Sequence, residues 1–276
     1  MKKVIIAFFL LLNFPMLAQE ISLVSYNIKY ANENDGENSW SNRKEFITNQ
    51  LKFYEPDLFG VQEALLPQMN HFKDSLEGYD YAGVGRENGE KQGEYSAIFY
   101  KKDLFKILKS NTFWLSATPE KVSTGWDAAL PRICTYALFE DMRSGKRFWF
   151  FNTHFDHIGV EARTNSAQLI LNKIAEINTG NLPVFLSGDF NLEPDAEGIQ
   201  LIKLSMQDSK ENAATVSFGS EGTFNGFHFQ EKVTKRIDFI FTNDKVKIQK
   251  YGVLTDSKEM RYPSDHFPVF ISAELK

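Results

Sequence analysis

Acids, amides and imidazoles stand at the ends of apolar runs along this sequence. Asn27 closes the run in LVSYN, Glu63 follows LFGVQ, and His154 closes FWFFNTH. Asp189 and Asn191 follow VFLSG in the same manner. A rigid strand holds a side chain at its tip in a fixed position, and this is how an accurate site is built.

The same pattern continues toward the C-terminus. Asp238 lies in RIDFIF, and the pair Asp265 and His266 opens the last apolar run, in YPSDHFPVF. Taken singly, each polar residue has an ordinary explanation as a turn former, a solvated helix start or a surface ion pair. The whole series is harder to explain by turn chemistry, and it favours a composite site.

Together these residue types suit metal-assisted transfer of a phosphoryl group to water. Glu63, helped by Asn27 and another acid, offers the hard oxygen ligands that Mg²⁺ prefers, with waters completing the octahedron. The metal would neutralise charge on a phosphate oxygen and on the leaving group. Two histidines with carboxylate partners would add acid-base capacity and cationic stabilisation.

Six segments carry a resemblance to a known family: SYNIKY, GVQEA, NTHFDH, SGDFN, RIDFIF and SDHFP. In this order they resemble the motifs of the endonuclease/exonuclease/phosphatase superfamily, which has a deoxyribonuclease-I-like fold. The resemblance covers residues 21–275 and implies an α/β four-layer sandwich of two packed mixed β-sheets flanked by helices. Stretches such as DGENSWSNRKEFI resemble a bacterial exported subgroup described as metal-dependent hydrolases of unknown substrate.

The resemblance implies a role for each motif residue. Glu63 is expected to be the principal ligand of Mg²⁺, for which Mn²⁺ can substitute, with Asn27 and Asp265 close to the metal or the phosphate. Asp189 is expected to orient or deprotonate the attacking water. Asn191 is expected to hold a phosphate oxygen.

The two histidines are assigned in the same way. His266 is expected to contact the scissile phosphate and to be oriented by Asp238. His154 resembles the second histidine of the nuclease and sphingomyelinase branches, with Glu94 in GEYSAIFY as its carboxylate partner. Abasic-site endonucleases usually have an acid two residues after the first-strand Asn, and Lys29 occupies that position here, which weakens the abasic-site interpretation.

Three further residues are candidates for substrate binding. Arg86 and Arg132 lie beside turns that lead into the site, where each could hold a second phosphate or anionic group. A structural or solvated arginine is the competing interpretation. Trp126 offers an aromatic face to a sugar or base, with packing beneath a loop as the alternative. His157 is expected to be peripheral.

The elements that must position these residues are short. Apolar runs predict strands at residues 22–28, 58–62, 79–84, 95–100, 134–139, 148–153, 184–187, 236–241 and 269–273. Three- and four-residue spacing predicts helices near 43–54, 67–75, 163–178 and 196–204. The runs 95–100 and 104–108 together predict a hairpin-like pair.

The N-terminus predicts export. Lys2 and Lys3 precede the apolar run 4–12, and Pro15 and a cleavage site near Ala18 follow, which together indicate a signal peptide over residues 1–18. The run is too short to span a membrane, so we expect no stable membrane insertion. Residues 19–276 are expected to form one domain and a monomer, periplasmic or secreted.

The net charge of the mature chain limits which ligands the protein is expected to bind. The 31 basic residues less Lys2 and Lys3 leave 29 against 36 acidic ones, a net charge near −7, which argues against a large nucleic-acid-binding face. The first hypothesis is an exported phosphoesterase acting on a phosphate mono- or diester of a small phosphorylated molecule, a sugar phosphate or a phospholipid head group. The alternatives are a secreted nuclease acting on DNA or RNA and a catalytically silent binding protein.

Overall fold

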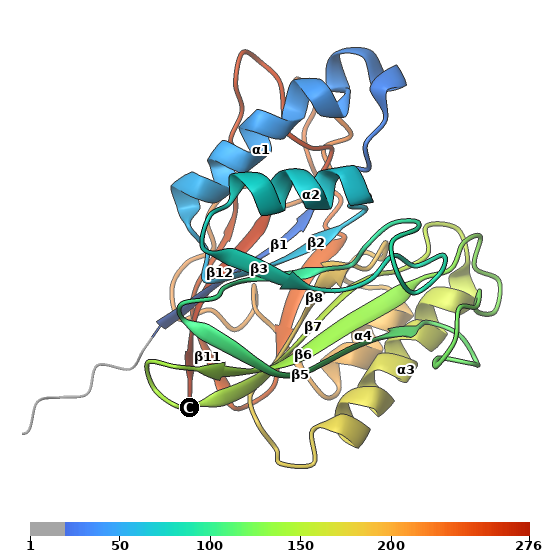
Figure 1. Ribbon diagram of the computed structural model, residues 1–276, viewed down its shortest axis with the longest axis vertical. Coiled ribbons are helices and arrows are strands. Elements are labelled where there is room, and N and C mark those ends of the chain that lie inside the picture. The colour runs from blue at the N-terminus through green and yellow to red at the C-terminus, as the bar shows by residue number, and fades with distance from the viewer. Residues whose placement is uncertain (1–19) are drawn as a thin grey trace, which may run out of the picture.

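Two six-stranded β-sheets pack face to face and carry helices on their outer faces (Figure 1). The computed structural model describes residues 20–276, so the predicted signal peptide lies outside the described residues. The predicted four-layer α/β sandwich is confirmed. Within residues 20–276, no helix combines the length and apolarity needed to cross a membrane.

The first sheet has the strand order β11-β12-β1-β2-β4-β3. Its strands are β1 (Glu20–Asn27), β2 (Leu58–Gln62), β3 (Tyr79–Ala82), β4 (Ile98–Lys101), β11 (Val246–Val253) and β12 (Val269–Leu275). β1 runs parallel to β2 and antiparallel to β12. The helices α1 (Trp40–Tyr54) and α2 (Leu66–Ser75) cover its outer face, and the 3-10 helix η1 (Glu33–Asn38) precedes α1 (Figure 1).

The second sheet has the order β5-β6-β7-β8-β10-β9. Its strands are β5 (Phe105–Trp114), β6 (Ile133–Asp141), β7 (Arg147–His154), β8 (Val184–Asp189), β9 (Gln207–Asp208) and β10 (Asp238–Thr242). β7 runs parallel to β8, and β10 runs antiparallel to it. The helices α3 (Val160–Ile177) and α4 (Glu197–Lys203) cover this sheet on its outer side (Figure 1).

Three apolar cores fill the three interfaces between the four layers. Phe105, Phe148 and Phe185 belong to the core between the sheets, where their rings meet edge to face. A second core joins the second sheet to α3 and α4, and a third joins the first sheet to α1 and α2. Because apolar burial contributes roughly 25 cal/mol per Å², these aromatic-rich cores supply the main driving force for folding.

One buried amide connects the two sheets. Asn152 on β7 donates both Nδ2 hydrogens to the first sheet, to Val61 O and Ala97 O at 2.9 Å each. Its Oδ1 accepts from Gln62 Nε2 at 2.7 Å and from Ser187 Oγ at 3.0 Å. All four hydrogen-bonding positions of the amide are therefore used, so Asn152 sets how the two sheets align.

Gly60 makes this contact sterically feasible. A Cβ atom at this position in β2 would lie 2.5 Å from Asn152 Oδ1 and 2.9 Å from Ser187 Oγ. Real Cβ atoms do not approach polar atoms so closely, so a side chain here would push the sheets apart.

The predicted hairpin is wrong. β4 pairs with β2 and β3 in the first sheet, whereas β5 pairs with β6 in the second. The turn between them instead carries the chain from one sheet to the other, and Ile98 and Phe105 on either side of it are both buried in the core between the sheets. The strand β11 was not predicted from the sequence.

We expect Asn152→Ala to lower the free energy of unfolding by about 2–4 kcal/mol, because it leaves buried partners on both sheets without a hydrogen bond. Urea denaturation measures the change. The control is Asn111→Ala on the exposed face of β5, which should change stability by less than about 0.5 kcal/mol. Equal effects at the two positions would contradict the role assigned to Asn152.

Candidate active site

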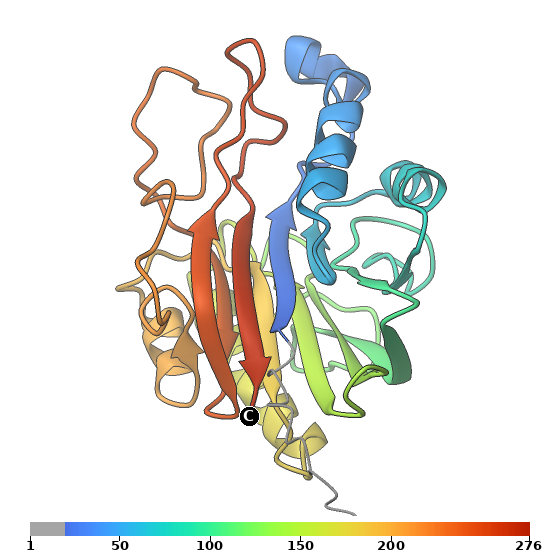
Figure 2. The same cartoon turned by 90° about the vertical axis from the view of Figure 1, so that its left-hand side faces the viewer.

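The predicted site residues converge at one end of the sandwich. β1, β2, β7 and β8 end there, and the antiparallel strands β10 and β12 begin there. His154, Asp189 and Asp238 occupy the same level of three neighbouring strands, with Asp189 paired in register to each of the others. Figure 2 shows loops rising at this end, toward which β1 points.

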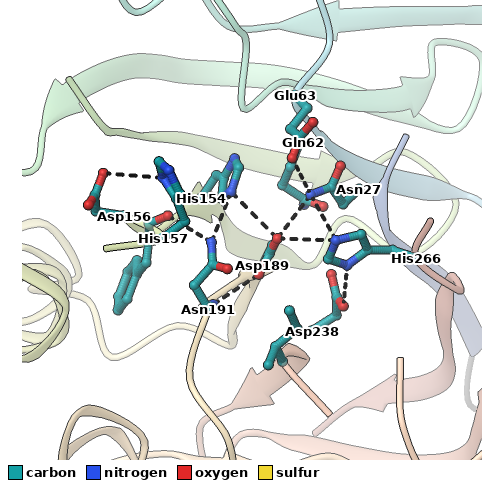
Figure 3. Close-up of polar contacts among 12 residues, drawn as sticks. Asn27, Gln62, Glu63, His154, Asp156, His157, Asp189, Asn191, Asp238 and His266 are labelled. Atoms are coloured by element: carbon teal, nitrogen blue, oxygen red, sulfur yellow. Dashed lines mark hydrogen bonds and ion pairs between the residues drawn. The ribbon is translucent and has the colours of Figure 1, made fainter. Parts of the chain in front are cut away.

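His266 and Asp238 form a buried pair at the centre of the site (Figure 3). His266 Nδ1 donates to Asp238 Oδ2 at 2.8 Å. The other ring nitrogen, Nε2, faces Asp189 Oδ2 at 3.7 Å and Asn27 Nδ2 at 3.5 Å. Asn27 also donates to Asp189 Oδ2 at 2.9 Å, so the amide of Asn27 holds the carboxylate of Asp189 beside the imidazole.

Burial and charge oppose each other at this pair. Burial lowers the pKa of His266, but the carboxylates of Asp238 and Asp189 more than reverse this and raise it to about 10. Burial, followed by the charge of Asp238, raises the pKa of Asp189 to about 7. At neutral pH His266 is therefore an imidazolium, and Asp189 is poised between its acid and base forms.

His154 is a second buried imidazole, and it is neutral. Its Nδ1 accepts from Arg132 Nη1 at 3.1 Å, and its Nε2 lies 3.1 Å from Asn191 Nδ2 and 3.5 Å from Asp189 Oδ2. Burial, followed by the charges of Arg132 and Arg86, lowers the pKa of His154 well below its ordinary value.

Glu63 provides an ionised carboxylate directly after the C-terminal end of β2, an interior strand of the first sheet. Its Oε1 accepts from Asn27 Nδ2 at 3.1 Å, and its Oε2 accepts from the backbone N–H of Tyr30 at 3.1 Å. Burial raises the pKa of Glu63, but Lys29 and the Asn27 hydrogen bond more than offset this, so the net pKa is lowered. Asp265 opens onto the same space, so hard anionic oxygens are gathered where Mg²⁺ would be expected.

A second donor set lies beside the first. Ligand atoms of Asp189, Asp238 and His266 all lie within 4.8 Å of one another. A metal-bound imidazole must be neutral at the ligating nitrogen, whereas His266 is hydrogen-bonded through Nδ1 and has a raised pKa. The Glu63 set therefore fits a hard divalent cation better than this triad does.

Glu63, His154, Asp189, Asp265 and His266 border one cleft with a volume of about 820 Å³. Asn27 and Asp238 do not line it and contact its lining residues from behind. The lining residues of the cleft come from strand ends and from the loops between them. They include Lys29, Tyr30, Glu63, Glu94, Leu130, Arg132, His154, His157, Asp189, Asn191, Leu192, Glu193, Phe224, Lys235, Ile237, Asp265 and His266. The arrangement suits binding and hydrolysis of a compact anionic ester.

Comparison with known proteins supports this chemistry. The model of the Endonuclease/Exonuclease/phosphatase family matches residues 24–266. The chain belongs to this family. Members of the family are hydrolases of phosphate esters and generally depend on a divalent metal.

Two solved structures from Bacteroides thetaiotaomicron are similar over nearly the whole chain. One is an endonuclease/exonuclease/phosphatase family protein, 40% identical with a TM-score of 0.90, covering 94% of this chain and 99% of that one. The other is a mannosyl-6-phosphatase, 41% identical with a TM-score of 0.88, covering 92% and 99%.

More distant relatives include Nocturnin of Drosophila melanogaster. It is 24% identical over 320 residues, covering 95% of this chain and 48% of that protein. The chain spans between 31% and 60% of the length of the first curated relatives it matches.

In this protein, the three residues predicted to bind substrate lie in different surroundings. Arg132 lines the cleft and is held by Asp156 Oδ1 at 3.2 Å. Arg86 is buried and bonds Glu94 Oε2 at 2.6 Å. Trp126 is partly exposed and lines a separate depression over α3. Only Arg132 is brought to the cleft.

Glu94, the predicted carboxylate partner of His154, lies closer to Arg86 than to His154. Glu94 Oε2 lies 3.8 Å from His154 Nδ1, beyond hydrogen-bonding distance, because Arg132 occupies that nitrogen. His157, expected to be peripheral, instead lines the cleft, where its Nδ1 accepts from Arg132 Nη2 at 2.9 Å.

Sequence reasoning did not assign Lys29 or Lys235 to the cleft. Lys29 lies two residues after Asn27, so its closeness in sequence to a predicted site residue was an available signal. The sequence had indicated Phe224 as an aromatic face for a sugar or base, with packing beneath a loop as the alternative, and its ring centroid lies 5.0 Å from that of His266. Lys235 lies in the long segment between β9 and β10. The path of such a segment is set by tertiary contacts, and no local pattern reports it.

We expect Asp238→Asn to lower the pKa of His266 from about 10 toward its ordinary value, because the substitution removes the closest negative charge. Titration of the imidazole by NMR measures this shift. Asp156→Asn serves as the control, because Asp156 contacts Arg132 and His157. An unchanged pKa of His266 in Asp238→Asn would contradict the assignment of the pair.

Proposed function

We propose that this protein is an exported, Mg²⁺-dependent phosphoesterase that hydrolyses a phosphate ester of a small molecule by attack of water. The observation that carries the proposal is the convergence of an imidazolium, a carboxyl group with a pKa about 7 and an ionised Glu63 on one cleft. A volume of about 820 Å³ lies within the range of about 300–1,000 Å³ for small-molecule sites.

The side chains divide the work between the two sides of the phosphate. Asp189 accepts a proton from the attacking water as the water oxygen bonds to phosphorus, and its pKa of about 7 suits a base at neutral pH. The P–O bond to the alcohol breaks in the same displacement, and the leaving oxygen takes a proton from solvent. His266 donates a charged hydrogen bond from Nε2 to a phosphate oxygen, while Asp238 fixes the ring through Nδ1. Mg²⁺ held at Glu63 and Asp265 would supply Lewis-acid stabilisation of the phosphate charge, while Asn27, predicted as a third ligand, orients the Glu63 carboxylate through Nδ2.

A sugar phosphate is the substrate class with the most support. The similarity to a mannosyl-6-phosphatase extends over 92% of this chain at 41% identity. A phospholipid head group remains the second candidate within the same chemistry. A nuclease has less support, because the chain is acidic and long anionic polymers are bound by many basic residues.

A catalytically silent binding protein is disfavoured by the acid-base geometry. Asp189, Asp238 and His266 are ionisable groups that are buried. His266 is hydrogen-bonded to Asp238, and the pKa of Asp189 is raised. Such burial is costly for folding and has a use in catalysis. Export rests on residues 1–18, and we propose that the mature chain acts as a periplasmic or secreted monomer.

The proposal predicts release of inorganic phosphate in the presence of Mg²⁺ or Mn²⁺. Purified residues 19–276 would be assayed against mannose 6-phosphate, other sugar phosphates, a phosphocholine ester, plasmid DNA and RNA. We expect turnover of a small ester, loss of turnover in EDTA and a roughly 10²–10⁴-fold lower rate in His266→Ala. Glu63→Gln should weaken Mg²⁺ binding measured by calorimetry.

Other outcomes of this panel have defined meanings. Cleavage of DNA or RNA without turnover of any small ester would replace the proposal with the nuclease alternative. Failure of the wild-type protein on every substrate with metal present would support the binding protein. Unchanged Mg²⁺ affinity in Glu63→Gln would move the metal to the Asp189, Asp238 and His266 triad.

The pH dependence of kcat/KM should be bell-shaped. The rate rises with pH as Asp189 loses its proton, near or below pH 7 because a bound cation lowers the pKa of a neighbouring carboxyl. It falls as pH approaches about 10, where His266 loses its proton. In Asp238→Asn the alkaline limb should move to lower pH, and an unmoved limb would assign it to another group.

A further inference from the structure

Lys29 shares an uncommon backbone state with two predicted site residues. Among residues 20–276, nine residues other than glycine have φ in the left-handed region, and three of them line the cleft. These are Lys29 with φ 56°, Glu63 with φ 62° and Asn191 with φ 49°. Side chains with a Cβ atom adopt this region at a cost, and such strain concentrates at functional sites.

The strained turn at Lys29 is held from two helices. Gln68 Nε2 on α2 donates to Lys29 O at 2.9 Å, and Arg43 Nη2 on α1 donates to the same oxygen at 3.2 Å. Both side chains are buried. Arg43 Nη1 also donates to Pro263 O at 2.8 Å, so one guanidinium ties the Lys29 turn to the segment that precedes Asp265.

The N–H of Lys29 completes the turn. It donates to Asn27 Oδ1 at 3.0 Å, which fixes the amide of Asn27 so that its Nδ2 points at Glu63 and Asp189. The backbone that presents Lys29 therefore also orients a predicted site residue, and its position is as constrained as that of the site itself.

The ammonium group of Lys29 lies in the cleft without a close partner there. Its Nζ stands 3.9 Å from Asp265 Oδ2, a distance at which charges attract but no hydrogen bond forms. It rests 4.2 Å from the centroid of the Tyr30 ring, which limits its rotation. The side chain is 23% exposed, so its N–H donors are open to an oxygen of a ligand.

We propose that Lys29 binds a non-bridging oxygen of the phosphate and selects dianionic phosphomonoesters over monoanionic diesters. The inference rests on the proposed phosphoesterase function and names its substrate class. A phosphomonoester carries about −1.5 to −2 charge at pH 7, whereas a diester carries only one negative charge. A fixed cation beside His266 and the metal-binding carboxylates favours the ligand with the additional charge.

The test compares Lys29→Met, Lys29→Arg and the wild-type protein. Two substrates with the same leaving group, p-nitrophenyl phosphate and p-nitrophenyl methyl phosphate, differ by one charge. We expect Lys29→Met to lower kcat/KM for the monoester roughly 10- to 100-fold, as loss of a charged hydrogen bond does, and for the diester several-fold less. Lys29→Arg should restore most of the preference.

Lys235→Met is the matched control. Lys235 lines the same cleft but lies exposed on the rim, so its loss should lower kcat/KM for both esters alike and leave their ratio unchanged. An equal loss for both esters in Lys29→Met would overturn the proposal.

Calorimetry separates this proposal from the proposed function. In EDTA at pH 8, inorganic phosphate should bind Lys29→Met roughly 10- to 100-fold more weakly than it binds the wild-type protein, whether or not any ester is hydrolysed. Dimethyl phosphate should show little difference between the two proteins. Unchanged phosphate affinity in EDTA, together with tighter Mg²⁺ binding in a separate titration without EDTA, would show that Lys29 only neutralises Glu63 and Asp265.

Discussion

The hydrogen bonds of Asn152 are the constraint on which the rest of the structure depends. The two sheets are joined mainly by apolar side chains, and apolar contacts alone set no unique alignment. A buried amide whose four hydrogen-bonding positions are all used does set one, because any slip would leave polar atoms unsatisfied. The active site needs that alignment, since Asn27 and Glu63 come from one sheet and Asp189 from the other.

The site gathers charge that burial alone would not tolerate. Asp189, Asp238 and His266 are nearly completely buried, and the charge of the imidazolium is what keeps two carboxyl groups close together. The same burial raises the pKa of Asp189 to about 7. A carboxyl group that titrates near neutral pH, as the proposed base must, therefore arises directly from the packing of two sheet ends.

The two cationic side chains Arg132 and Lys29, which both line the cleft, differ in how many protein groups they contact. Arg132 is committed to Asp156 and to both His154 and His157, so it stiffens the wall of the cleft. Lys29 is held by its backbone while its ammonium stays open, as a ligand-binding group requires. This contrast separates an arginine that organises the protein from a lysine that is free to meet an anion.

Strand-tip polar residues predicted the convergence of Asn27, Glu63, His154 and Asp189, because alternating burial and strand direction are local properties. The hairpin from residues 95–108 was wrong because both runs are apolar enough for either sheet, and the core between the sheets buries Ile98 of β4 as well as Phe105 of β5. Pairing with β2 and β3 in one case and with β6 in the other decides where each run lies. Local patterns do not contain that choice.

The sequence by itself determined the layer architecture, the identity of the acids and imidazoles, and the family to which they belong. Only the tertiary structure decided their states and partners. In the folded protein Arg86 forms an ion pair with Glu94, Trp126 lies outside the cleft, and Lys29 lines it. The physical reason is that the charge state and the partner of a side chain depend on its distances to residues far apart in the chain. Electrostatic interactions weaken as these distances grow, and the distances are fixed only when the sheets pack.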